Sequence, residues 1–393
     1  MNSNRKILVV KMAAPNASSS SMIRTLAVIK GFVENGYEVD LFCIHANSNI
    51  VLKDLSGYSF MEHVNIIYAD EEKNGGANQA VYGMLSGSKG GIKHKLFKIA
   101  RKLYHYTTLY DFTHDIAKKV SIEKLPSKEY EYVMSDSDPK TSHIAMAKLV
   151  EQGLTYKKWI QYWGDPLVGD ISASKTIYTK KAIKREEKKL FSKADKIVYT
   201  SPFTLQEEQR IQPEFANKMI FVPTPFIETK IYSETKNNIF TVGYYGDYFS
   251  NNRDIMPLYN ACNGMKNELI LNVMGKADFA LEKTDNINVF PRGDISELEK
   301  KTDLYICVLN KKGTQIPGKL YHYAATNRPV LVLVDGDNKE AMIEYIAGFD
   351  RYLWCNNEEN NIIQKLRAVM AEKQIWEPCK RLNCREISAE IIS

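Results

Sequence analysis

The feature that most constrains the fold is an alternation of short apolar runs with amphipathic helical segments. Residues 6–10 (KILVV) form an uninterrupted, β-branched run, which is typical of a strand buried on both faces of a parallel sheet. A Ser-rich loop, a helical pattern over residues 22–34 and Gly36 follow, and residues 37–43 form the next apolar run. This order predicts a parallel sheet covered by helices.

The alternation continues and then restarts after Pro223-Thr-Pro225, which fits a stiff linker. Before the linker we predict strands at residues 132–134, 159–160, 196–199 and 219–222, and a helix at 181–192. After it we predict strands at 239–244, 268–274, 287–290, 303–309 and 329–334, and helices at 253–262 and 317–325. The chain is therefore expected to hold two Rossmann-like α/β domains, residues 1–223 and 224–376, that face each other across a ligand-binding cleft. Residues 377–393 are expected to carry a last helix, about residues 387–392, that returns to the first domain.

Composition and motifs exclude several classes of protein. Hydrophobic residues make up 44% and charged residues 25%, which is ordinary for a globular chain and argues against disorder. The six cysteines are scattered without zinc-ligand spacing, so we expect a reducing, cytoplasmic compartment. The apolar runs are too short for a signal peptide or a membrane span. The sequence has no GxGxxG, GxxxxGK[ST], HExxH or GxSxG motif, which argues against dinucleotide oxidoreductases, P-loop NTPases and common hydrolases.

The most informative motif is residues 315–331, QIPGKLYHYAATNRPVL, which indicate a loop, a short helix, a turn and a buried strand. Lys319 falls near the start of the helix, where free N–H groups and a cation attract anions such as phosphate. The alternative is that Lys319 is an ordinary solvated lysine of the surface.

This run resembles the donor-binding motif of retaining glycosyltransferases of GT-B fold, specifically glycosyltransferase family 4. The matching positions are Pro317, Lys319, Tyr323, Ala325, Pro329 and Val330. His322 stands where the family has the second glutamate of a pair, and Thr314 stands at the first. The resemblance implies that Gly246, Thr314, Pro317, His322 and Tyr323 bind the donor, with His322 hydrogen-bonding a ribose hydroxyl.

The resemblance extends over nearly the whole chain. The segments that carry it are Met22-Ile-Arg24 with Gly36, residues 135–139 with Ser142-His143, residues 159–166, Glu186-Glu187 before residues 194–201, and residues 243–246 with Arg253. It implies that Arg253, Lys319 and His143 are catalytic and that Ser20, Arg24, Asp136 and Asp165 lie on the acceptor side.

Some of these polar residues have alternative interpretations. Asp136-Ser-Asp138 could be the metal-binding Asp-x-Asp of the other glycosyltransferase fold, GT-A, but a second α/β domain after a proline linker favours a plain polar loop at a strand end. His143 is either a site residue or a satisfied helix histidine. Asp165 either meets substrate hydroxyls or caps a turn. We predict no metal site.

The positive charge of the chain is concentrated in one stretch. The formal net charge is +6, and no acidic residue lies between Glu72 and Asp111. Lys95, Lys98, Arg101 and Lys102 fall on the polar face of a predicted amphipathic helix, which is typical of a protein that lies on anionic lipid. A solvated helix face is the alternative, and nucleic acid is disfavoured because no binding module accompanies the stretch.

Together these features predict a hexosyltransferase-type glycosyltransferase that needs no cofactor and acts with retention. It would move a sugar from a UDP- or GDP-linked donor to a lipid-linked or polysaccharide acceptor, as in capsule synthesis, on the cytoplasmic face of the membrane. The alternatives are a non-catalytic nucleotide-sugar or glycan-binding protein and a nucleotide-sugar epimerase of GT-B fold.

Overall fold

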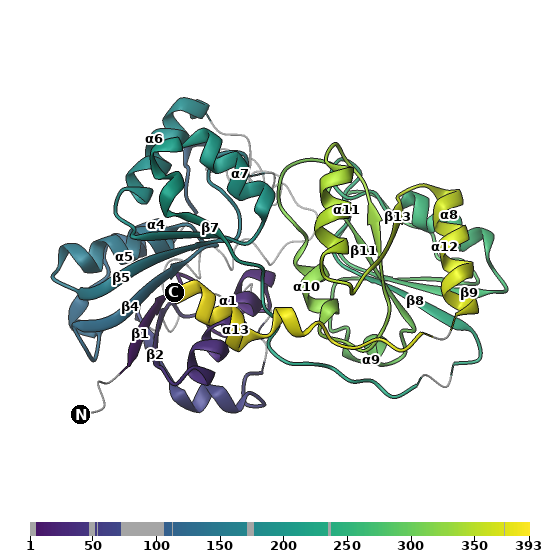
Figure 1. Ribbon diagram of the computed structural model, residues 1–393, viewed down its shortest axis with the longest axis horizontal. Coiled ribbons are helices and arrows are strands. Elements are labelled where there is room, and N and C mark those ends of the chain that lie inside the picture. Colours follow the sequence, from purple (N-terminus) through teal and green to yellow (C-terminus); the bar gives the residue numbers. More distant parts are fainter. Residues whose placement is uncertain are drawn as a thin grey trace, which may run out of the picture. The chain divides into compact units, whose positions relative to one another are not determined.

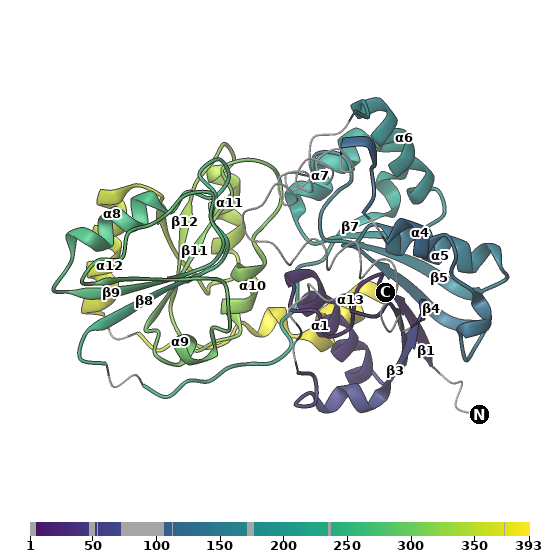
Figure 2. The ribbon, with the colours of Figure 1, turned by 180° about the vertical axis from the view of Figure 1, so that it is seen from behind.

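The computed structural model describes residues 5–46, 52, 54–71, 106–111, 113–170, 177–234, 237–372 and 374–393. The chain divides into two compact units. Unit 1 is Met1–Ile227 together with Cys384–Ser393, and unit 2 is Glu228–Asn383. Each is built on one parallel sheet with helices on both faces (Figures 1 and 2), which confirms the predicted class of two Rossmann-like α/β domains.

Unit 1 contains a seven-stranded sheet of order β3-β2-β1-β4-β5-β6-β7. The strands are β1 (Lys6–Val10), β2 (Glu38–Cys43), β3 (Val64–Tyr68), β4 (Glu129–Asp136), β5 (Thr155–Trp163), β6 (Lys196–Tyr199) and β7 (Met219–Phe221). The helices are α1 (Ser20–Glu34), α4 (His114–Ala117), α5 (Thr141–Glu151), α6 (Lys180–Phe191), α7 (Pro202–Ile211) and α13 (Cys384–Ile392). Short 3₁₀ turns lie at Ser59–His63, Ile122–Lys124 and Pro213–Lys218.

The buried residues of β1 alternate between two cores, as a strand covered on both faces requires. Ile7 and Val9 pack in a cluster with α1 and α13, whereas Leu8 and Val10 pack in a cluster with α5. Helix α1 begins at the N-cap Ser19, whose hydroxyl accepts from the Met22 N–H at 3.1 Å. The start of α1 lies at the carboxyl ends of β4 and β5, because the Asp138 N–H donates to the Ser21 hydroxyl at 3.0 Å and Arg24 packs against Gly164.

Helix α13 lies along α1 (Figure 1), although the two are separated by most of the chain. A Cβ at Gly31 would lie 2.0 Å from the carbonyl oxygen of Cys384, so only glycine allows the two backbones to approach this closely. The Ser388 hydroxyl donates to the Val28 carbonyl at 2.9 Å, and the Asn35 amide donates to the Arg385 carbonyl at 2.8 Å.

Unit 2 contains a six-stranded sheet of order β10-β9-β8-β11-β12-β13. The strands are β8 (Phe240–Tyr245), β9 (Leu269–Met274), β10 (Ile287–Phe290), β11 (Leu304–Val308), β12 (Val330–Val334) and β13 (Leu353–Asn356). The helices are α8 (Met256–Gly264), α9 (Ser296–Lys300), α10 (Gly318–Ala324), α11 (Lys339–Ala347) and α12 (Glu359–Ala371), and a 3₁₀ turn lies at Lys380–Leu382. Helices α8 and α12 cover one face of this sheet, and α10 and α11 lie on the other (Figure 2).

Candidate active site

In unit 2, predicted donor-site residues lie at the carboxyl edge of the sheet. Gly246 directly follows β8, and Arg253 lies in the turn before α8. The Arg253 guanidinium donates from Nη2 to the Asn310 side-chain oxygen at 2.8 Å and from Nη1 to the Asp247 carbonyl at 3.1 Å. Both partners are neutral oxygens, and no carboxylate of the described residues pairs with the guanidinium. The guanidinium is therefore held in place with its charge not neutralised.

Lys319 is the second cation at this edge, on the short helix α10. Its ammonium lies 5.4 Å from the centre of the Tyr323 ring, and it has no hydrogen-bond or ion-pair partner in the described part of the chain. Burial lowers the pKa of Lys319 to about 8, with Glu299 acting in the opposite direction. The side chain is therefore still mostly charged at pH 7, and an anion beside it would favour the charged form further.

Tyr323 and Gln315 line the interior of this region. Tyr323, on α10, is fully buried and stacks on Tyr305 of β11, with ring centres 4.4 Å apart. This aromatic contact packs α10 against the sheet. Gln315 is buried too, and neither polar atom of its side chain has a partner in the described residues. Its backbone carbonyl accepts from Asn310, the residue that holds Arg253. Thr314 is half-buried and Pro317 is buried, immediately before α10.

His322 contacts a carboxylate that sequence reasoning did not identify. Its Nε2 lies 3.1 Å from Oε1 of Glu299, on α9. The other carboxylate oxygen of Glu299 accepts from Lys230 Nζ at 2.7 Å. Burial lowers the pKa of His322 to about 4, although the hydrogen bond to Glu299 raises it. Burial would raise the pKa of Glu299, but the contacts from His322 and Lys230 bring it to about 2.

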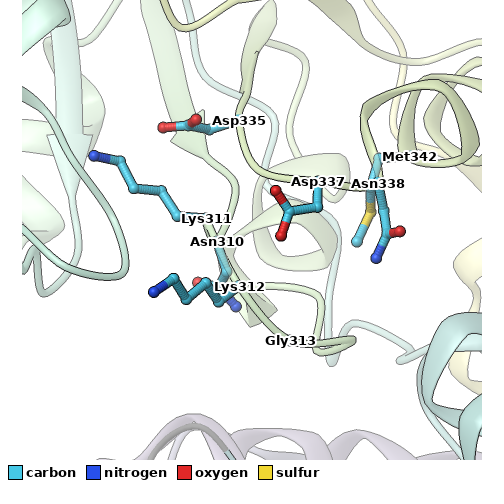
Figure 3. A pocket seen from close by; sticks show the side chains of 8 residues that line it. All are labelled: Asn310, Lys311, Lys312, Gly313, Asp335, Asp337, Asn338 and Met342. Atoms are coloured by element: carbon cyan, nitrogen blue, oxygen red, sulfur yellow. The ribbon is translucent and has the colours of Figure 1, made fainter.

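A small hollow lies beside Asn310, the residue that holds Arg253, between the loops that follow β11 and β12 (Figure 3). It has a volume of about 30 Å³ and is lined by Asn310, Lys311, Lys312, Gly313, Asp335, Asp337, Asn338 and Met342. Gly336, between the two aspartates, has φ +85°, and a Cβ there would lie 2.5 Å from the Lys311 carbonyl oxygen. Only glycine at position 336 lets the loop after β12 approach the backbone of Lys311 this closely. Asp335 and Asp337, on either side of it, line one wall of the hollow.

In unit 1, a buried ion pair ties β1 to β4. Lys11 Nζ lies 3.2 Å from Oδ1 of Asp136, and both side chains are fully buried. Thr25 donates to the other oxygen of Asp136 at 2.6 Å, and Lys11 also donates to the Ser21 hydroxyl. Burial lowers the pKa of Lys11 to about 8, while Asp136 raises it. Asp136 is thus placed behind the edge of the sheet, with both oxygens already engaged.

A second cluster of charges lies nearer the surface of the same edge. Lys140 donates to Asp138 at 2.9 Å and to Asp170 at 2.8 Å, and Asp138 is in hydrogen-bond contact with Asp165. Two carboxyl groups in such contact must share a proton. Burial and the neighbouring Asp138 and Asp170 raise the pKa of Asp165 to about 7, whereas Lys140 and Arg24 lower it. Asp165 is half-buried, and the Asp138 side chain is 35% exposed, so solutes can reach the pair.

Arg24 joins this cluster from α1, and Ser20 does not. The Arg24 guanidinium donates to the Ser137 carbonyl at 2.8 Å, and a Cβ at Gly164 would lie 2.0 Å from Nη2 of Arg24. Gly164 therefore makes room for the guanidinium directly before Asp165. Ser20, the first residue of α1, is exposed.

His143 is fully buried at the start of α5. It stacks on Trp163 with ring centres 4.2 Å apart, and its Nδ1 lies 2.8 Å from the Ser135 hydroxyl. Burial lowers the pKa of His143 to about 3, so the ring is neutral at pH 7. Its Nε2 has no hydrogen-bond partner within the described residues.

The predicted basic face, Lys95, Lys98, Arg101 and Lys102, lies outside the described residues. Among the described residues, no helix is long and apolar enough to cross a membrane. The part of the chain that the structure describes also holds no group of three or more His, Cys, Asp or Glu side chains arranged to bind a metal ion.

Sequence reasoning missed several residues of these sites. They are Lys11, Lys140 and Asp170 in unit 1 and Lys230, Glu299, Asn310 and Gln315 in unit 2. Gln315 is the first residue of the motif at 315–331 but was not selected as a site residue, and Lys140 directly follows the selected segment 135–139. Lys230 and Glu299 lie outside every motif, and the sequence carries no signal for the contact of Glu299 with His322 or of Lys230 with Glu299.

The comparisons with known proteins agree on the architecture. Neither a protein-family model nor a curated protein sequence matches this chain. Among solved structures, sucrose-phosphate synthase from Thermosynechococcus elongatus matches with a TM-score of 0.52 and 13% identity over 98% of this chain and 94% of that one. S. aureus TarM, solved as a point mutant in complex with UDP and glycan ligands, matches with a TM-score of 0.53 and 9% identity over 98% of this chain and 95% of that one. Both are glycosyltransferases of GT-B fold. With its two parallel-sheet, Rossmann-like units, the chain has the GT-B fold.

Proposed function

We propose that this protein is a glycosyltransferase that takes a sugar from a nucleotide-sugar donor. The observation that carries the proposal is the pair of half-buried cations at the carboxyl edge of unit 2, Arg253 and Lys319, neither of which has a carboxylate partner in the described residues. A diphosphate is the anion that such a site would suit, because two separate cations can meet its two phosphate groups. Unit 2 would then be the donor-binding unit.

The same two cations would assist the chemistry. When the bond between the sugar and the diphosphate breaks, negative charge grows on the departing nucleoside diphosphate. Fixed positive charges, held before the reaction begins, stabilise that developing charge without a metal ion. Arg253 is suited to this because Asn310 and the Asp247 carbonyl already hold its guanidinium in place. We therefore propose transfer without a metal requirement.

Unit 1 would bind the acceptor. Its accessible carboxyl pair, Asp138 and Asp165, with Lys140 beside it, offers several hydrogen-bonding groups to the hydroxyls of a saccharide. We propose a lipid-linked or polysaccharide acceptor, as in capsule synthesis, and retention at the anomeric carbon, which the resemblance to glycosyltransferase family 4 implies. The basic face of residues 95–102 would hold the enzyme on the cytoplasmic face of the membrane. Binding to anionic liposomes that persists when Lys95, Lys98, Arg101 and Lys102 are neutralised would contradict this last point.

Calorimetric titration with UDP, GDP and a panel of their sugar conjugates tests donor binding. Lys319→Ala should weaken binding of the preferred nucleotide at least about tenfold, because hydrogen bonds to charged groups contribute about 1.5–3 kcal/mol. Lys339→Ala, at the half-buried first residue of α11, is the matched control and should bind as the wild type does. Equal affinities of the wild type and Lys319→Ala would refute the diphosphate assignment. Binding without sugar release or transfer would favour the non-catalytic alternative.

A further inference from the structure

The Glu299 carboxylate contacts His322, and two further residues of unit 2, Lys230 and Tyr232, hold the carboxylate in place. The carboxylate itself comes from α9, its Oε1 faces His322 Nε2 at 3.1 Å, and its Oε2 accepts from Lys230 at 2.7 Å and from the Tyr232 hydroxyl at 3.2 Å. The Glu299 side chain is only 2% exposed. Lys230 is fixed in turn, because its backbone N–H donates to the Ala325 carbonyl at 2.8 Å, just after α10.

This arrangement determines which ring nitrogen of His322 carries the proton. Burial keeps the pKa of His322 near 4 and the contacts of Glu299 keep its pKa near 2, so the imidazole is neutral and the carboxylate is ionised at pH 7. An ionised carboxylate can only accept hydrogen bonds. Nε2 must therefore be the protonated nitrogen, and Nδ1 is left with a lone pair.

Nδ1 is available to a ligand. Nδ1 has no hydrogen-bond partner in the described residues, and it remains accessible to solvent. Lys319 precedes His322 by three residues, so the two side chains lie on the same side of α10. This side of the helix thus presents an unpaired ammonium and, next to it, a neutral hydrogen-bond acceptor.

We propose that Glu299 is a positioning residue that fixes the Nε2-protonated form of His322, so that Nδ1 accepts a hydrogen bond from a hydroxyl of a nucleotide sugar bound at Lys319. This inference rests on the proposed function for its ligand. The lone pair on Nδ1 repels phosphate oxygens, so the diphosphate would be bound by Lys319 and Arg253. The hydroxyl belongs either to the ribose or to the donor sugar, since both offer the same O–H donor.

The substitution Glu299→Gln tests this assignment because it reverses the polarity of the contact. Lys230 can only donate, so the oxygen of the new amide must face Lys230 and its NH₂ must face His322. Nε2 then has to accept, and the proton moves to Nδ1. Glu297→Gln, on the same helix but with a side chain that is 78% exposed, is the matched control.

Two measurements read out the change. The ¹⁵N spectrum of histidine-labelled protein, with His322 assigned by its loss in His322→Asn, should show Nε2 protonated in the wild type and Nδ1 protonated in Glu299→Gln. Calorimetry compares the affinity for UDP with that for its 2′-fluoro and 3′-fluoro analogues. It also compares UDP-glucose with UDP-glucose that carries fluorine on the sugar ring. If the protein binds GDP, the guanosine compounds are used instead. Fluorine cannot donate, so one analogue should bind the wild type about three- to tenfold more weakly than its parent. The analogue that shows this penalty identifies the source of the hydroxyl.

In Glu299→Gln the ligand hydroxyl can no longer donate to Nδ1, although its oxygen can still accept from the Nδ1–H, so the fluorine penalty should shrink. Inorganic pyrophosphate, which has no hydroxyl donor of this kind, should bind no more weakly. Glu297→Gln should keep the wild-type spectrum and the wild-type penalty. The inference is wrong if no fluorinated analogue is penalised in the wild type, or if Glu299→Gln keeps both the spectrum and the penalty. In those cases nucleotide and pyrophosphate would still bind, so the proposed function would stand. If neither bound, the proposed function would fail and this inference with it.

Discussion

At the scale of single residues, Lys319 of unit 2 differs from the buried lysines of unit 1 in whether a charged partner is already present. In unit 1, Lys11 is paired with Asp136, and Lys140 is paired with Asp138 and Asp170. In unit 2, Lys319 has no charged partner among the described residues. In a buried ion pair each charge is already stabilised by the other. A half-buried cation without a partner is stabilised more strongly when an anion binds beside it from solution. This contrast is why we assign the diphosphate to unit 2.

Asp165 gives a prediction about stability and pH. Because its pKa is raised from 3.8 to about 7, the folded protein holds a proton there that the unfolded chain loses near pH 4. The stability that this proton contributes is fully present below about pH 4 and is lost as the pH rises through 7. Asp165→Asn cannot ionise, and its amide can still donate to Asp138. We expect its free energy of unfolding to rise relative to the wild type by up to about 1 kcal/mol per pH unit between pH 5 and 7.

Urea unfolding at pH 5, 6, 7 and 8 measures this difference. Asp138, Asp170, Lys140 and Arg24 all face Asp165, so none of them serves as a control. Asp285→Asn, at an exposed position in unit 2, is the control and should follow the wild-type curve. Parallel curves for Asp165→Asn and the wild type would show that Asp138 and Asp165 do not share a proton.

At the scale of elements, the packing of α13 on α1 depends on a single missing side chain. A Cβ at Gly31 would lie 2.0 Å from the Cys384 carbonyl and 2.2 Å from the Ser388 hydroxyl. Glycine within a helix normally costs about 0.5–1 kcal/mol relative to alanine. At this position alanine should be the less stable residue, because α13 would have to shift to make room for its Cβ. We expect Gly31→Ala to destabilise unit 1 by about 1–3 kcal/mol.

Thermal or urea unfolding tests this prediction against a glycine with free space around it. Gly264, the last residue of α8, would have nothing within 4 Å of an added Cβ, so Gly264→Ala should be neutral or slightly stabilising. If Gly31→Ala were as stable as Gly264→Ala, the close packing of α1 and α13 would be incorrect.

The sequence predicted the central strands better than the edges. The runs that became β1, β6 and β12 are buried on both faces, and such strands appear as continuous apolar segments. Two edge strands, β3 and β13, were not predicted, because most of their residues are only half-buried and the sequences VNIIY and LWCN mix polar with apolar residues. Short apolar runs thus signal burial, and β3 and β13 lack that signal, whereas the other two edge strands, β7 and β10, were predicted from their apolar runs.

The candidate sites were predictable only where one motif spans them. The sequence placed Lys319, His322 and Tyr323 on one short helix, and α10 carries all three. The contact of His322 with Glu299 joins residues 23 positions apart, and that of Lys230 with Glu299 joins residues 69 positions apart. Such contacts depend on how the elements of unit 2 pack, and spacing along the chain does not encode them. The same holds for Asp138 and Asp165, which the pairing of β4 with β5 brings together.

At the scale of the whole molecule, we assign one task to each unit. Unit 2 would bind the donor through Arg253 and Lys319, and unit 1 would offer Asp138, Asp165 and Lys140 to the acceptor. Water can replace the acceptor in such enzymes, so slow hydrolysis of the donor reports the chemistry even before the acceptor is identified. Loss of either cation should reduce this turnover, since each stabilises the departing diphosphate.

The most direct test is to measure the release of nucleoside diphosphate from a panel of nucleotide sugars in the presence of EDTA. We predict that at least one donor is consumed, and that Lys319→Ala and Arg253→Ala each reduce its kcat/KM about tenfold or more, whereas Lys339→Ala does not. Failure of the wild type to consume any donor, or turnover that EDTA abolishes and Mn²⁺ restores, would contradict the assignment of metal-independent glycosyl transfer to this protein.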